Sequence, residues 1–156
     1  MDYAQGTMGR VFAVRFDHQD DFLTELRGLI KKENIRNAWF HVLGGLQQAA
    51  IVTGPREPVM PPEPVWREMQ GANEVLGFGT IFWDQEEPMI HLHAALGHHG
   101  ATVTGCVRKD ATTYLILEAV IVEIAGLAAH RPWFAAGGFN RLTFGAPPAG
   151  PADRTG

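Results

Sequence analysis

The chain has little cysteine, and this limits its chemistry at once. Among 156 residues there is a single cysteine, Cys106. It cannot form an intrachain disulfide, which is typical of proteins in a reducing compartment, so we expect a cytoplasmic location. The first residues contain no basic region followed by an apolar run, so we expect no signal peptide. The longest apolar stretch, residues 115–129, is shorter than a membrane span and includes two glutamates, so we expect no membrane insertion.

Basic residues are also scarce. Thirteen Lys and Arg stand against 17 Asp and Glu, which gives a net charge of −4 at pH 7, and the arginines are scattered rather than clustered. This balance argues against nucleic acid as a partner, because general attraction to phosphates requires excess positive charge. The sequence also lacks the glycine-rich phosphate loops and the serine-centred nucleophile elbow that would indicate a nucleotide-binding protein or a serine hydrolase.

Apolar residues, in contrast, are sufficient for one globular domain. Hydrophobic residues make up 46% of the chain and charged residues 19%, an ordinary balance for a globular protein. A length of 156 residues is typical of a single domain with its own core. We expect a flexible leader over residues 1–9, one domain over residues 10–144, and a disordered tail rich in Pro, Gly and Ala over residues 145–156.

One helix is expected among many strands. Residues 19–33 carry an apolar stripe at helical spacing, with Asp17 as N-cap and Asn34 as left-handed C-terminal residue. Gly44–Gly45 is expected to separate two strands. The segments expected as strands are residues 10–16, 35–43, 46–53, 65–69, 74–83, 89–96, 102–107, 112–124 and, at the edge, 140–144. The pattern predicts an α+β domain with a mainly antiparallel sheet and one principal helix.

The most informative segment is an HxH pair, His91 and His93, in an apolar strand. Side chains alternate along a strand, so both imidazoles point to the same face. If the next hairpin has a two-residue loop at His99–Gly100, or a four-residue loop on the same bond, His93 lies opposite Cys106. The three side chains could then bind one metal ion, and zinc accepts this donor set. A three-residue loop would turn Cys106 to the other face, and the histidine pair would then be an incomplete metal site or a purely structural pair.

Two carboxylates are candidates to orient these histidines through a hydrogen bond, without binding the metal themselves. Glu118 lies inside a long apolar strand, where a buried carboxylate needs a hydrogen bond or an opposite charge, so it is a candidate to orient a histidine. Glu74, at the start of another strand, has the same interpretation. In the alternative interpretation each carboxylate faces solvent or pairs with an arginine.

Several motifs in combination resemble a known family. They are Gly9-Arg10, Ile35-Arg36-Asn37-Ala38, Gly44-Gly45-Leu46, residues 74–81 and His91-Leu92-His93-Ala94, followed by Gly100, Gly105 and residues 118–121. In this order and spacing they resemble the plants and prokaryotes conserved (PPC) domain, over about residues 9–125.

The resemblance implies a small α+β fold that assembles as a homotrimer. In plants the domain is fused to AT-hooks, basic segments that bind the DNA minor groove, but this chain resembles the stand-alone prokaryotic members, which lack them. Some of those members hold a metal on the HxH pair and on a histidine in a following Gly-Gly-His segment. Here the corresponding segment is Thr104-Gly105-Cys106, so cysteine stands where the third histidine is expected.

Three functions remain open from the sequence. The first is an oligomeric protein of undefined biochemical role that binds a metal ion, with zinc as the candidate, or a small ligand at the HxH strand. The second is a zinc-dependent enzyme, with His91, His93 and Cys106 as ligands and Glu118 or Glu74 as general base on bound water. The third is a DNA-binding regulator by analogy with the plant relatives, and the charge balance counts against it.

Overall fold

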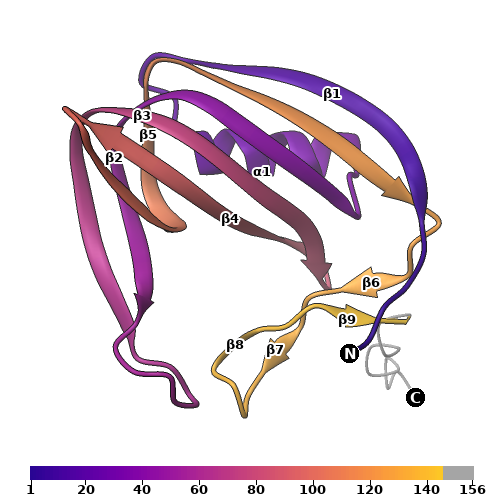
Figure 1. Cartoon of the computed structure of the whole chain (residues 1–156). Helices are drawn as coiled ribbons and strands as arrows, with labels where there is room; N and C mark the ends of the chain where they lie inside the picture. The colour runs from indigo at the N-terminus through magenta and orange to yellow at the C-terminus, as the bar shows by residue number, and fades with distance from the viewer. Residues whose placement is uncertain (146–156) are drawn as a thin grey trace, which may run out of the picture.

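An antiparallel sheet and one helix form most of the structure. The computed structural model describes residues 1–145 (Figure 1). Its long elements are β1 (Thr7–Asp17), α1 (Phe22–Glu33), β2 (Ala38–Pro55), β3 (Pro64–Asp84), β4 (Glu87–His98) and β5 (Ala101–Ala125). The short strands β6 (Ala129–His130), β7 (Trp133–Phe134), β8 (Phe139–Asn140) and β9 (Thr143–Phe144) follow. Every pairing in the main sheet is antiparallel, which confirms the predicted α+β class.

The ends of the domain differ in part from the predicted ones. Thr7 already pairs with Ala125, so β1 begins inside the segment predicted as a leader. The predicted edge strand over residues 140–144 does not join the main sheet. Asn140 ends β8, and Thr143 and Phe144 form β9; these strands pair with β7 and β6 in two small sheets. The predicted tail lies outside the described residues from residue 146 on.

Three predicted breaks between strands are wrong, because the strands continue through them. The merged pairs of segments are 35–43 with 46–53, 65–69 with 74–83, and 102–107 with 112–124, which form β2, β3 and β5. At Gly44 the cause is visible. Gly44 pairs with Leu117 whereas Gly45 pairs with Tyr114, so β5 bulges here. Gly44 has φ +130°, and a Cβ on it would collide with the carbonyl oxygen of Ile116. The glycine thus permits close approach of two bent strands and does not end one.

Strand β5 is long enough to pair with three other strands. The sheet order is β1-β5-β2-β3-β4, and β5 pairs with β4 as well. Its C-terminal part lies between β1 and β2, and its N-terminal part lies between β4 and the end of β2, where Cys106 pairs with Val52. The pairings of β2, β3, β4 and β5 therefore form a closed circuit, which brings the end of β2 next to the β4–β5 hairpin.

Helix α1 begins later than predicted and ends where predicted. Asp21, not Asp17, is the N-cap, and its side chain accepts a hydrogen bond from the Thr24 backbone N–H at 2.8 Å. Asp17 ends β1, and its backbone N–H donates to the Asp20 carboxylate, so the residues between them form the turn. Asn34 closes the helix in the left-handed conformation, with φ 50° and ψ 48°. No helix among residues 1–145 is long and apolar enough to cross a membrane.

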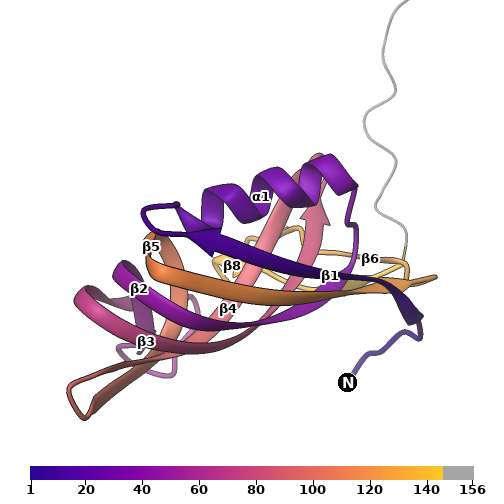
Figure 2. The same cartoon turned by 90° about the horizontal axis from the view of Figure 1, so that it is seen from above.

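The main sheet has one covered and one open face. Figure 2 shows α1 lying across one face, where Phe40, Ile81 and Leu92 are buried in the same core as the helix stripe. On the opposite face, Leu76 is 67% exposed and Phe78 is 56% exposed. Phe78 pairs directly with His93 across β3 and β4, so the histidines of the HxH pair share this open face.

Candidate metal centre

The β4–β5 hairpin places the candidate ligands opposite one another. Its turn residues His99 and Gly100 have φ +48° and +82°, as the two central residues of a type I′ turn require. His98 pairs with Ala101, and His93 therefore pairs with Cys106. This is the register expected from a two-residue loop, so Cys106 points to the same face as the histidines.

The three donor atoms lie close enough for one metal ion. One ligand atom from each of His91, His93 and Cys106 lies within 4.8 Å of the other two. The two Nε2 atoms are 3.1 Å apart, and the imidazole planes are inclined at 77°. Bond lengths of 2.0–2.3 Å in a tetrahedral zinc site place ligand atoms roughly 3.3–3.8 Å apart, so this cluster fits with small side-chain adjustments. Three protein ligands would leave one position open.

The surroundings shift the pKa values of His91 and Cys106 in opposite directions. Desolvation, assisted by the charges of Arg131, His93 and Arg108, lowers the pKa of His91 to about 4. His91 is therefore neutral at pH 7, which is the form that binds metals. Burial raises the pKa of the Cys106 thiol, although the nearby arginines oppose this. Metal binding would therefore displace a proton from Cys106.

A cavity of about 730 Å³ opens over the three ligands. Three parts of the chain enclose it: the β4–β5 hairpin, the end of the β2–β3 hairpin, and the segment from Arg131 to Asn140. In Figure 1 the end of the β2–β3 hairpin and the β7–β8 hairpin extend from the same side of the sheet. Residues from these distant parts of the sequence include Trp66 and Trp133. The site is thus a hollow that a small molecule can enter.

Arg131 is one of two arginines of this cavity that sequence reasoning missed. It is only 7% exposed, and its backbone N–H donates to the Trp83 carbonyl oxygen. Its Nη2 donates to Thr80 Oγ1 at 2.9 Å, and its guanidinium lies 5.1 Å from the centre of the Phe82 ring. Burial lowers the pKa of Arg131, and Cys106 acts in the opposite direction. No local signal marks Arg131, because it follows the last regular strand of the main sheet.

Arg108 also lines the cavity, and here a signal was available. It lies two positions after Cys106 in β5, so strand alternation predicts that both side chains point to the same face. The two arginines make the surroundings of the ligand cluster electropositive.

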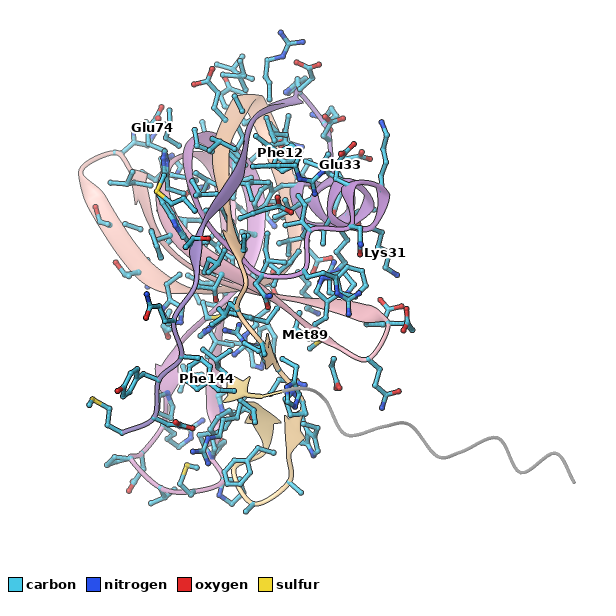
Figure 3. All side chains as sticks on the ribbon, turned by 90° about the vertical axis from the view of Figure 1, so that its right-hand side faces the viewer. Phe12, Lys31, Glu33, Glu74, Met89 and Phe144 are labelled. Atoms are coloured by element: carbon cyan, nitrogen blue, oxygen red, sulfur yellow. The ribbon has the colours of Figure 1, made fainter. Side chains whose placement is uncertain are left out.

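The structure does not bring the two candidate carboxylates to the cluster. Glu118 is exposed, and in the strand register it lies opposite Arg15 of β1 and Leu43 of β2. In the sheet order, β2 and β3 therefore separate it from β4. The prediction for it failed because the apolar run around it suggested burial on both faces, whereas one face of the sheet is open. Glu74 is also exposed and lies opposite Gly97, four positions or about 13 Å along β4 from His93. Figure 3 shows Glu74 far from Met89, which lines the cavity.

Comparisons with known proteins agree on the fold. The profile of the Plants and Prokaryotes Conserved (PCC) domain, the family also abbreviated PPC, matches residues 3–125. A comparison with curated protein sequences finds no significant match. A metal-containing protein from Archaeoglobus fulgidus is similar in structure, with TM-score 0.80, 20% identity, and coverage of 92% of this chain and 99% of that chain. At these identities the solved structures inform on the fold alone.

Two further solved structures have the same architecture. A plant- and prokaryote-conserved (PPC) protein from Pyrococcus horikoshii has TM-score 0.77 and 21% identity, and the match covers 93% of this chain and 99% of that chain. A proposed DNA-binding protein from Ralstonia eutropha has TM-score 0.72 and 18% identity, with coverage of 85% and 90%.

Proposed function

The chain belongs to the Plants and Prokaryotes Conserved (PCC) domain family, and we propose that this member binds one divalent metal ion, zinc, at His91, His93 and Cys106. The observation that carries the proposal is the convergence of the three donor atoms at the wall of a cavity. Two imidazoles and a thiolate form a donor set that binds zinc in preference to magnesium or calcium. The similar protein from Archaeoglobus fulgidus contains a metal, which supports the proposal without identifying the ion here.

The role that we propose is a binding module with an open metal position, not a hydrolytic enzyme. A zinc hydrolase needs a base within hydrogen-bond reach of the metal-bound water. Glu118 and Glu74 were the candidates for this base, and neither lines the cavity. The open position would instead accept a donor atom of a small ligand held in the cavity.

Elemental analysis of untagged protein purified without chelator tests the metal site. We expect a stoichiometric amount of zinc in the wild type and none in His93→Ala, because two remaining ligands hold the ion too weakly. His98→Ala is the matched control, since His98 belongs to the same hairpin but not to the cluster, and it should keep its zinc. Absence of bound zinc after addition of the ion in excess would contradict the proposal.

The reactivity of Cys106 gives an independent test of the third ligand. In the metal-free protein its thiol has a raised pKa, whereas a bound metal holds it as a coordinated thiolate. Zinc-loaded protein should therefore release zinc when a thiol reagent attacks, and it should react at a different rate from chelator-treated protein. Equal rates in the two forms would remove Cys106 from the ligand set and leave the histidine pair alone.

We also propose that the chain forms a homotrimer through the open face of the sheet. The resemblance to the family suggests the trimer, and the exposed side chains of Leu43, Leu76 and Phe78 support an interface on this face. Sedimentation equilibrium should give three times the chain mass, and Phe78→Asp should shift the protein to monomer. Val59→Asp, in the β2–β3 loop, is the control and should remain trimeric. A wild-type monomer at micromolar concentration would contradict this proposal.

A further inference from the structure

The cavity beside the candidate metal centre contains a buried cation with an unused donor. Arg131 is 7% exposed, and its Nη2 is satisfied by Thr80. Its Nη1 is buried and has no hydrogen-bond partner among the described residues. Arginine stays charged in proteins, and buried N–H groups normally have acceptors. An acceptor that belongs to another molecule would complete this arrangement.

The described residues supply no negative charge near Arg131. It takes part in none of the ion pairs found within residues 1–145. No Asp or Glu from that part of the chain lines the cavity, whereas a second arginine, Arg108, does. Buried charges are normally paired, because removing them from water is costly. The missing partner of Arg131 is therefore an anion from outside residues 1–145.

The rest of the cavity indicates what kind of anion fits. Much of its wall is apolar and aromatic, with Trp66, Met89, Trp133 and Phe139 among the lining residues. Its volume of about 730 Å³ lies within the range of small-molecule sites and far exceeds the need of an inorganic ion. This combination suits a molecule with an anionic head and an apolar body.

We infer that the cavity binds a small organic carboxylate, whose carboxylate accepts a hydrogen bond from Nη1 of Arg131 while its apolar body contacts Trp133 and Phe139. The inference deepens the proposed function by naming the class of ligand in the cavity. It rests on the proposed function in one respect only, that the open position of the bound metal would face this ligand. The contact with Arg131 itself requires no metal. A carboxylate is favoured because its oxygens match the N–H groups of a guanidinium.

Benzoate is a suitable probe, and calorimetry together with thermal unfolding measures its binding to the zinc-treated full chain. We expect saturable binding and a rise in melting temperature, because a ligand that binds the native state stabilises it. Benzyl alcohol has the ring without the charge, and inorganic phosphate has charge without the apolar body. Both should bind at least about tenfold more weakly. Equal binding of phosphate would overturn the assignment to an organic carboxylate.

Substitutions then locate the anion. Arg131→Gln should weaken benzoate binding by about 10- to 100-fold, as expected for loss of a charge-assisted hydrogen bond. The control is Arg141→Gln, which removes an exposed arginine of the same segment that stacks on Phe134 and does not line the cavity. Undiminished binding by Arg131→Gln, or loss only in Arg108→Gln, would overturn the inference. If Arg131→Gln fails to fold, Arg131→Lys keeps the charge, and it should still lose most of the affinity.

The metal and the anion can be separated in the same experiment. Benzoate binding that depends on Arg131, in a protein that takes up no zinc from an excess of the ion, would contradict the metal proposal and support the anion site. Stoichiometric zinc without any benzoate binding would support the metal site and overturn the carboxylate inference alone.

Discussion

Arg10 joins three segments of the chain through its guanidinium. Its Nε and Nη2 donate to the two carboxylate oxygens of Glu123 in β5, at 2.7 and 2.8 Å. Its Nη2 also donates to the main-chain oxygen of Glu33, the last residue of α1, at 2.7 Å. The paired hydrogen bonds to Glu123 set the geometry of the contact between β1 and β5. The Gly9-Arg10 motif of the sequence thus has a structural role away from the cavity.

Glu123→Gln should lower the free energy of unfolding near neutral pH. Hydrogen bonds from Arg10 lower the pKa of Glu123 in the folded protein. Its stabilising contribution is therefore complete above the unfolded pKa of about 4.3 and is lost as pH falls through the lower folded pKa. Urea unfolding from pH 7 to pH 3 should show the difference between wild type and variant shrinking below about pH 4.

A matched control separates this effect from a general loss of charge. Glu63→Gln removes the partner of Arg56, and both side chains of that pair are more than 60% exposed, at 67% and 64%. Exposed pairs contribute little to stability, so this variant should unfold like the wild type at every pH. A constant difference for Glu123→Gln across the whole pH range would show that its charge is not the cause.

At the scale of the elements, the bulge between β2 and β5 at Gly44–Gly45 shapes the architecture. Leu115 adopts φ +57° on β5, opposite the glycines of β2. A bulge bends a strand and increases its twist. The bend lies between the part of β5 that pairs with β1 and the part that pairs with β4. It therefore lets one strand serve both ends of the sheet and brings Cys106 to the histidines.

Two glycine substitutions should have opposite effects on stability. Gly44→Ala places a methyl group against the Ile116 carbonyl at φ +130°, so it should destabilise by about 1–3 kcal/mol. Gly28→Ala lies in α1, and outside the backbone of its own helix no atom lies within 4 Å of the new methyl group, so it should stabilise by about 0.5–1 kcal/mol. Denaturant unfolding measures both. A neutral Gly44→Ala would mean that the bulge can relax without cost.

For the molecule as a whole, the net charge of −4 governs its long-range interactions. We predict negligible affinity for duplex DNA at physiological salt, because few phosphate contacts can form and the chain as a whole is repelled. Fluorescence anisotropy with a labelled AT-rich duplex should show no saturable binding. Tight binding that weakens steeply with salt would instead show that a local group of arginines overrides the net charge.

Much of the candidate site was predictable because its information is local. Alternation along β4 placed His91 and His93 on one face, and the turn at His99–Gly100 set the pairing of His93 with Cys106. The end of α1 at Asn34 is similarly local. Each of these features depends on residues that are close together in the sequence, in one helix end or one hairpin. At this range the periodicity of side chains and the conformation of the turn decide the structure.

By itself, then, the sequence determined the antiparallel α+β class, the helix end and the family, and it limited the hairpin register to two alternatives, of which the structure has the one with a two-residue loop. Only the tertiary structure decided that Gly44 lies within a strand, that Glu118 lies on an open face, and that Arg131 enters the cavity. The physical reason is distance along the chain. Arg131 bonds to Thr80, 51 residues away, and Gly44 is explained by a bulge in a strand more than 70 positions further on. Such contacts depend on which strands become neighbours, and local patterns do not record this.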